Sequence, residues 1–229
     1  MTAGTVRAPS AGRRSPLRRV VVTILLVALA VVMVRGLVVQ SFVIPTSSMR
    51  PTLVAGDRIL VSRSSYLLGD VHRGDVVVFD AAGVFEPEPE RVRGLAAVGR
   101  GFARLLGVPV DERTYVKRVI GLPGERVACC DAQGRVTVDG TPLAEPYLAP
   151  GVEPSTVPFD IVVPRGRLWV MGDNRGSSGD SRAHLGDPGG GTVPQDRIVG
   201  RAIAVYWPPE RVGRSVSVDR EDRRSRRLS

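Results

Sequence analysis

Six short runs rich in valine and isoleucine recur along the chain, each bounded by glycine, proline or charged turn residues. They read DRILVSR, GDVVVFD, TYVKRVIGL, RVTVDG, RLWVMGD and RIVGRAIAVYW, and they occupy residues 57–63, 74–80, 114–122, 135–140, 167–173 and 197–207. β-Branched residues between turn-forming residues are typical of strands. The 229 residues, 43% of them hydrophobic, suffice for one core with a smaller insertion. The sequence therefore predicts a mostly β fold.

Three segments depart from this pattern. The apolar spacing of residues 91–108 favours a helix, which we expect to be an exposed excursion between two strands. Residues 141–166 are rich in proline and are predicted to be irregular. The stretch GDPGGG at 186–191 predicts a flexible loop.

An uncharged apolar run begins at Val20 and, interrupted by Arg35, continues past Val39. Residues 20–39 are long enough to cross a bilayer if Arg35 reaches the far interface. The alternative is a cleaved signal peptide, because Ala28-Leu29-Ala30 resembles a cleavage site. The apolar run continues beyond that site, which favours an uncleaved anchor. The basic flank 1–19 is then cytoplasmic, and the residues after the anchor lie outside the cytoplasmic membrane in a single-pass protein.

The net charge of +9 lies in the two tails. Residues 1–19 hold five arginines and no acid, and residues 211–229 hold seven arginines against three acids. Residues 20–210 are therefore neutral overall, which argues against a nucleic-acid surface. No zinc-finger, RNA-binding or Walker motif is present. We expect 211–229 to be a disordered basic tail that touches anionic lipid or cell-wall polymer.

The two cysteines, Cys129 and Cys130, are adjacent. With no second cysteine pair, and with histidine only at positions 72 and 184, a zinc site is not expected. A vicinal disulfide and two separate thiols are equally compatible with this pattern.

Lys117 is the only lysine among 32 lysine and arginine residues. Arginine carries the same charge but does not lose its proton in proteins, whereas a buried lysine can. One interpretation is that position 117 requires a removable proton; the other is that an arginine-rich composition left one lysine by chance. Tyr115, Lys117 and Val119 share one face of the predicted strand, where the neighbours can desolvate the amine.

Two further stretches can carry chemistry. In SFVIPTSSMRPTL, residues 41–53, prolines flank two serines in a rigid turn that exposes hydroxyl groups; an ordinary linker is the alternative. In MGDNRGSSGDSRAHL, residues 171–185, hydroxyl and carboxylate groups follow an apolar strand, although such loops often only satisfy their own backbone.

In order behind an apolar anchor, the motifs SSMRPTL, RGDVVVF, YVKRVIGLPGE and GDNRGSSGDSR resemble those of bacterial type I signal peptidase. The resemblance covers roughly residues 40–80, 114–128 and 168–206. It implies a mostly β catalytic core with a small β-rich insertion, preceded by one transmembrane helix. We place the core at 40–128 and 167–210, and the insertion at 129–166.

The resemblance also assigns roles within this sequence. Ser48 is the nucleophile and Lys117 the general base of a serine endopeptidase. The backbone N–H of Ser48 and the hydroxyl of Thr46 hold the oxyanion. Ser178 forms a hydrogen bond with Lys117 and orients it.

Further assignments concern the loop and the substrate. Asp180 and Arg182 form an ion pair that braces the loop of Ser178. Two shallow apolar pockets accept small residues at −1 and −3 of the cleaved bond. The residues matching the pockets are Phe42, Ile44, Met49, Leu53, Ile59, Val78, Tyr115 and Val116.

The implied partners are signal peptides of secreted preproteins and membrane lipid, but not nucleic acid. No cofactor or metal is implied, so we expect activity to persist in EDTA, and we expect a monomer. The competing interpretations are a Ser/Lys peptidase dedicated to one substrate and an anchored binding module in which Ser48 and Lys117 are incidental. A self-cleaving repressor uses a similar fold and dyad, but it needs a DNA-binding domain rather than a membrane anchor.

Overall fold

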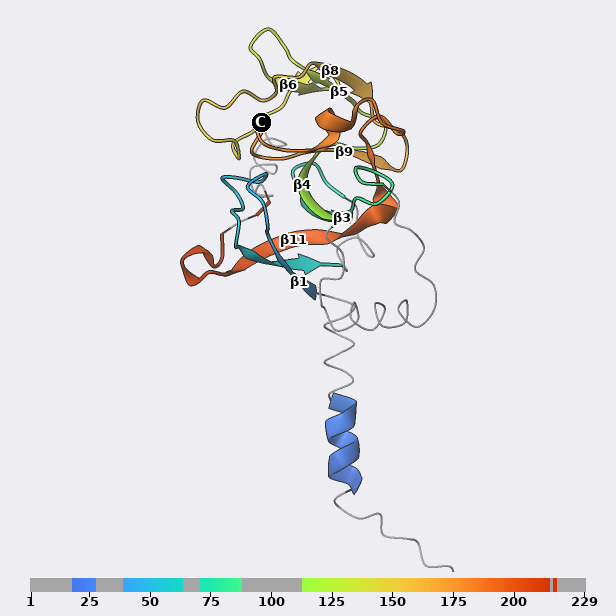
Figure 1. Cartoon of the computed structure of the whole chain (residues 1–229), viewed down its shortest axis with the longest axis vertical. Coiled ribbons are helices and arrows are strands. Elements are labelled where there is room, and N and C mark those ends of the chain that lie inside the picture. Colours follow the sequence, from blue (N-terminus) through green and yellow to red (C-terminus); the bar gives the residue numbers. More distant parts are fainter. Residues whose placement is uncertain (1–17, 28–38, 64–70, 88–112, 215, 218–229) are drawn as a thin grey trace, which may run out of the picture.

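The computed structural model describes residues 18–27, 39–63, 71–87, 113–214 and 216–217. Within these ranges, seven antiparallel strands form the larger sheet in the order β1-β2-β11-β3-β4-β9-β10 (Figure 1). Their bounds are β1 Val39–Val43, β2 Arg58–Ser62, β3 Val76–Asp80, β4 Thr114–Gly121, β9 Arg167–Met171, β10 Val193–Pro194 and β11 Ile198–Trp207. Three short 3-10 helices are η1 Ser181–His184, η2 Gln195–Arg197 and η3 Pro209–Arg211.

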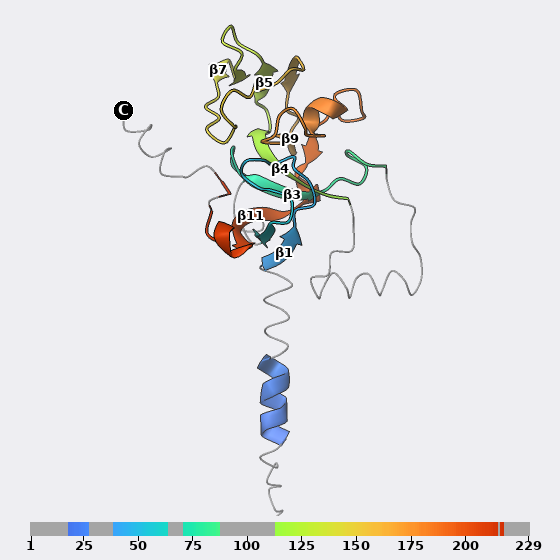
Figure 2. The ribbon, with the colours of Figure 1, turned by 60° about the vertical axis from the view of Figure 1, so that its left-hand side comes forward.

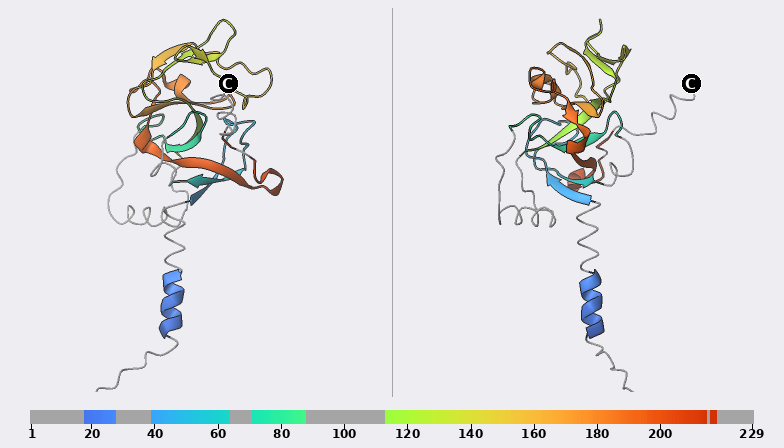
Figure 3. Two further views of the ribbon diagram at one scale, coloured as in Figure 1. Left: turned by 180° about the vertical axis from the view of Figure 1, so that it is seen from behind. Right: turned by 90° about the vertical axis from the view of Figure 1, so that its right-hand side faces the viewer.

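The described residues also form a smaller sheet in the order β7-β6-β5-β8, which lies over one end of the larger sheet (Figures 1 and 3). Its strands are β5 Arg126–Cys129, β6 Val136–Val138, β7 Thr141–Pro142 and β8 Phe159–Val162. The proposed insertion at 129–166 overlaps this sheet, although the sheet itself begins at Arg126.

A buried apolar cluster joins the two sheets. Trp169 and Met171 of β9 and Ile120 of β4 pack against Val127 and Phe159 of the smaller sheet. Each of these five side chains is nearly or fully shielded from solvent. Because burial of apolar side chains drives folding, the smaller sheet is part of the same packed body as the larger one.

The mostly β prediction is confirmed, and each of the six predicted runs contains a strand. Two local expectations need correction. Residues 143–158 are irregular as predicted, but strands β7 and β8 lie at either side of them, where the backbone pairs with β6 and β5. Val39, expected at the end of the membrane segment, begins β1 and pairs with Ser62.

The start of the basic C-terminal segment is also ordered, contrary to expectation. The Nε atom of Arg211 donates a hydrogen bond to Asp57, and Val216 is buried in the core beneath β1, β2 and β11. An ion pair with a buried carboxylate and an apolar contact hold these residues in place. Residues 218–229, like the predicted helix at 91–108, lie outside the described residues.

Residues 18–27 are helical and stand apart from both sheets (Figure 2). The large apolar side chains between Val20 and Val27 are 45–63% exposed. Among the described residues, no helix has the length and apolarity needed to span a membrane. Residues 28–38 of the predicted anchor lie outside the described part of the chain.

Candidate active site

Ser48 lies in the loop that connects β1 to β2. The loop is closed at its base, where Ile44 N–H donates to the carbonyl oxygen of Asp57 and Gly56 N–H donates to that of Ile44. The side chains of Ile44 and Met49 are buried on either side of the half-buried Ser48. Apolar anchors on both sides therefore hold the serine hydroxyl at a fixed place on the surface.

Strand β4 brings Lys117 to this loop. The Nζ atom of Lys117 donates a hydrogen bond of 2.9 Å to the Oγ atom of Ser48, and Lys117 is only 3% exposed. Burial lowers the pKa of Lys117 to about 8, and the charges of Asp180 and Asp173 oppose this shift without cancelling it. A substantial fraction of the amine is therefore neutral near pH 8 and able to accept a proton.

Thr46 precedes the serine by two residues on the same loop. Its Oγ1 atom lies 3.3 Å from the Oγ atom of Ser48, and the Thr46 side chain is exposed. The hydroxyl can therefore donate a hydrogen bond to an oxygen that develops negative charge beside Ser48.

The loop that follows β9 carries the other polar groups. The backbone N–H of Asn174 donates to the carbonyl oxygen of Ser48 over 3.0 Å, and its side-chain amide donates to the carbonyl oxygen of Ser47 over 3.1 Å. Two bonds from one residue thus fix the backbone of the serine loop. Asn174 lies within the GDNR motif, but nothing in the motif by itself indicates these two contacts.

Asp180 and Arg182 form a buried ion pair within the same loop, with 2.9 Å between Arg182 Nη2 and Asp180 Oδ2. The Oδ2 atom of Asp180 also accepts from the backbone N–H of Gly172, and Arg182 donates to the carbonyl oxygen of Arg175. Burial raises the pKa of Asp180, but the hydrogen bonds and charge of Arg182 outweigh this effect, so the pKa lies below its ordinary value. The charged pair links both ends of the loop.

A pocket of about 410 Å³ opens beside Ser48 and Lys117. Ile44, Met49, Tyr115 and Val116 line it with apolar surface, while Thr46, Ser177 and others contribute polar atoms. A serine hydroxyl, a buried amine and a partly apolar pocket therefore lie together, which is an arrangement suited to cleaving acyl compounds.

Comparison with known proteins agrees with this chemistry. A family model described as signal peptidase, peptidase S26, matches residues 17–207. The chain belongs to the signal peptidase family. As a member of this peptidase family it is a hydrolase.

Individual relatives carry the same name. Signal peptidase I of Mycobacterium tuberculosis strain H37Rv is 38% identical, with 90% of this chain and 77% of the relative covered. A probable signal peptidase I of Mycobacterium leprae is 38% identical, with 80% and 73% covered, and signal peptidase I T of Bacillus subtilis is 31% identical, with 81% and 82% covered. A signal peptidase I crystal structure from Enterococcus faecalis is 24% identical, with a TM-score of 0.37, and covers 58% of this chain and 96% of that chain.

Only part of the predicted substrate surface of this signal peptidase reaches the pocket. Leu53, Ile59 and Val78 are completely buried in the core cluster beneath β1, β2 and β11, and Phe42 packs at the edge of that cluster. None of these four lines the pocket beside Ser48. Motif position identifies residues near the site, but the depth of each side chain depends on how the strands stack.

The predicted bond between Ser178 and Lys117 is not formed. The Oγ atom of Ser178 is buried and has no hydrogen-bond partner among the described residues. It instead lies close to Gly172, where a Cβ atom would come within 2.2 Å of it. The backbone at Gly172 and the side chain of Ser178 therefore pack closely, and this contact fixes the position of the Ser178 hydroxyl.

A second buried ion pair was missed by the sequence analysis. Arg118 and Asp173 are 1% and 0% exposed, and Arg118 donates to both carboxylate oxygens, at 2.8 and 2.6 Å. Arg118 follows Lys117 in the strand, and successive side chains of a strand point to opposite faces of the sheet. The side chains of Lys117 and Arg118 therefore lie on opposite faces of β4. The only sequence feature that could have indicated this ion pair is Asp173, the aspartate of the GDNR motif.

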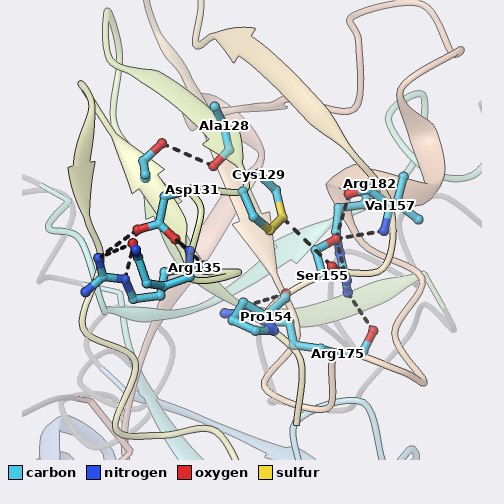
Figure 4. Close-up of a disulfide and its surroundings, with 12 residues drawn as sticks. Ala128, Cys129, Asp131, Arg135, Pro154, Ser155, Val157, Arg175 and Arg182 are labelled. Atoms are coloured by element: carbon cyan, nitrogen blue, oxygen red, sulfur yellow. Dashed lines mark hydrogen bonds and ion pairs between the residues drawn. A yellow bond between two sulfur atoms is a disulfide. The ribbon is translucent and has the colours of Figure 1, made fainter.

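The structure contains the disulfide between Cys129 and Cys130 (Figure 4). The Cys129 sulfur lies 3.9 Å from the carbonyl oxygen of Ser155, and the Ser155 hydroxyl accepts a 3.3 Å hydrogen bond from Arg182. The disulfide is thus connected to Asp180 by three successive contacts, through Ser155 and Arg182. Within the described ranges, no three histidine, cysteine, aspartate or glutamate side chains gather as metal ligands.

Proposed function

We propose that this signal peptidase removes N-terminal signal peptides from exported preproteins at the outer face of the cytoplasmic membrane. The observation that carries the proposal is the 2.9 Å contact between Ser48 Oγ and the buried amine of Lys117. The family membership supplies the substrate class.

The proposed reaction begins with neutral Lys117. Its amine takes the proton of the Ser48 hydroxyl as the serine oxygen attacks the carbonyl carbon of the cleaved bond. The backbone N–H of Ser48 and the hydroxyl of Thr46 bind the resulting oxyanion. Lys117 then donates the proton to the leaving amine, and later activates the water that releases the acyl group from Ser48.

The remaining assignments support this chemistry. The Asp180–Arg182 pair and Asn174 hold the loop that faces Ser48. The pocket beside the dyad is lined by Ile44, Met49 and Val116, and we infer that it receives the small residues at −1 and −3 that the family resemblance implies. Ser178 is not bonded to Lys117 in this structure, so its part in orienting the amine rests on the family resemblance alone.

Anchoring to the membrane is part of the proposal. The uncharged run from Val20 and the exposed apolar side chains of the 18–27 helix support insertion of this segment into a bilayer. Strand β1 begins at Val39, so Ser48 follows the anchor by few residues. A nucleophile near the bilayer surface suits a substrate whose apolar segment stays in the membrane.

The proposal is tested by cleavage of a peptide with an Ala-X-Ala site by the full chain in detergent. Lys117→Arg and Ser48→Ala are expected to lower kcat/KM by about 10³-fold or more, because neither variant retains both the proton acceptor and the nucleophile. Arg126→Lys, on the exposed side of β5, is the control that retains activity. Normal cleavage by folded Lys117→Arg would show that the general base lies elsewhere.

A further inference from the structure

Tyr115, which forms one wall of the pocket, is held by a residue that lies outside the pocket. Tyr115 lines the pocket beside Lys117, and its ring centroid lies 5.3 Å from the Lys117 Nζ atom. The Tyr115 hydroxyl donates a 2.8 Å hydrogen bond to the Oε1 atom of Glu86. Glu86 itself does not line the pocket.

Glu86 lies in a tight turn that directly follows β3. The backbone N–H groups of Phe85 and Glu86 both donate to the carbonyl oxygen of Ala81, and Gly83 N–H donates to that of Glu86. The side chain of Asp80 accepts from Ala82 N–H and fixes the entry to this turn. The carboxylate that meets Tyr115 is therefore presented by a rigid backbone.

Aromatic contacts complete the support of the ring. Tyr115 packs edge to face on Phe85, with centroids 5.9 Å apart, and is tilted against Phe79 at 6.0 Å. Phe85 in turn stacks on the His184 ring at 4.2 Å. These contacts set the plane of the ring, and the bond to Glu86 sets how far it leans into the pocket.

The hydroxyl keeps its proton over the working range of pH. Burial, followed by the hydrogen bond and the charge of Glu86, raises the pKa of Tyr115 to about 12. Tyr115 is therefore a permanent donor, and the charged acceptor makes the bond stronger than one between neutral groups.

We propose that Glu86 is a specificity-determining positioning residue: by holding the Tyr115 hydroxyl, it fixes the pocket wall nearest Lys117 and limits the size of the substrate side chain accepted at −1. This inference rests on the proposed function. Without the bond, the ring turns away from the pocket, and larger side chains fit. Glu86 touches neither the dyad nor the pocket, so it acts through Tyr115 alone.

The test uses full-length enzyme in detergent with peptides that carry Ala, Val or Leu at −1 and Ala at −3. The measured quantity is the ratio of kcat/KM for Ala to that for Val or Leu. Tyr115→Phe and Glu86→Ala are each expected to lower this ratio about tenfold, and the double variant no further. Glu86→Gln keeps an acceptor oxygen and is expected to retain the wild-type ratio.

Matched controls are Tyr206→Phe, which removes a hydroxyl remote from the pocket, and Glu153→Ala, which removes an exposed carboxylate; both are expected to retain the ratio. Tyr115→Phe removes only one oxygen atom, so it keeps the test open if Glu86→Ala fails to fold. An unchanged ratio in folded Tyr115→Phe overturns the inference alone, provided that cleavage by the wild type depends on Ser48. A wild type that cleaves no peptide overturns the proposed function and the inference with it.

Discussion

Two neighbouring cations on β4, Lys117 and Arg118, show how partner chemistry decides what a buried charge does. Arg118 is matched by the two carboxylate oxygens of Asp173, which compensate its desolvation. Lys117 meets only a neutral hydroxyl at 2.9 Å, so burial lowers its pKa instead. The Arg118 guanidinium is therefore paired with a carboxylate, whereas the Lys117 amine can lose its proton near pH 8.

This difference predicts the pH dependence of the enzyme. Because the proposed reaction requires neutral Lys117, kcat/KM is expected to rise about tenfold per pH unit below the lysine pKa of about 8 and to level off above it. The measurement is peptide cleavage by the full chain in detergent between pH 5 and pH 10. A rate that is already at its plateau at pH 6 would contradict a base with this pKa.

The loop after β9 acts as one element that positions the serine loop. Asn174 binds the carbonyl oxygens of Ser47 and Ser48, and a Cβ atom on Gly172 would lie 2.5 Å from the latter oxygen. The close approach of two backbones leaves room only for glycine at position 172. The site is therefore built by contact between loops that are distant in sequence.

Gly172→Ala is expected to lower kcat/KM by about 100-fold or more, because the added methyl group displaces the backbone that carries Ser48. The matched control is Gly176→Ala in the same loop, where an added Cβ meets nothing within 4 Å. Peptide cleavage and near-UV circular dichroism are measured for both. Equal activities in the two variants would show that the serine loop can move without loss.

At the scale of the whole molecule, Arg118 contacts segments of the chain that do not belong to one sheet. Besides Asp173, its guanidinium group donates to the carbonyl oxygens of Gly74 and Val216, and it lies over the Tyr147 ring at 4.1 Å. The ion pair between Arg175 and Glu145 lies beside the same tyrosine. This buried network joins the larger sheet to the segment between β7 and β8 and to the C-terminal segment.

Arg118→Met is expected to lower the free energy of unfolding by about 3–5 kcal/mol, since it leaves the carboxylate of Asp173 buried without its cation. Arg126→Met breaks the Arg126–Asp160 pair on the exposed side of the smaller sheet and is expected to leave stability nearly unchanged. Denaturant unfolding of the full chain in detergent compares the two. Similar midpoints would show that water or another group replaces Arg118.

The amino-acid sequence alone determined the β-rich fold and pointed to Ser48 and Lys117. Strand patterns and short motifs are local, so they can be read without knowing how the chain packs. The single lysine drew attention to position 117 because arginine cannot supply a removable proton, and the structure shows that Lys117 is buried and bonded to Ser48.

Only the tertiary structure decided which residues surround these two. Leu53 and Ile59 are core residues rather than pocket residues, while Asn174, Arg118 and Glu86 make contacts that no motif had indicated. Asn174 reaches a partner 127 residues away, and Glu86 one 29 residues away. Such contacts depend on how strands stack and where loops meet, and the physical reason is that burial and hydrogen bonding are properties of the packed molecule rather than of any segment of it.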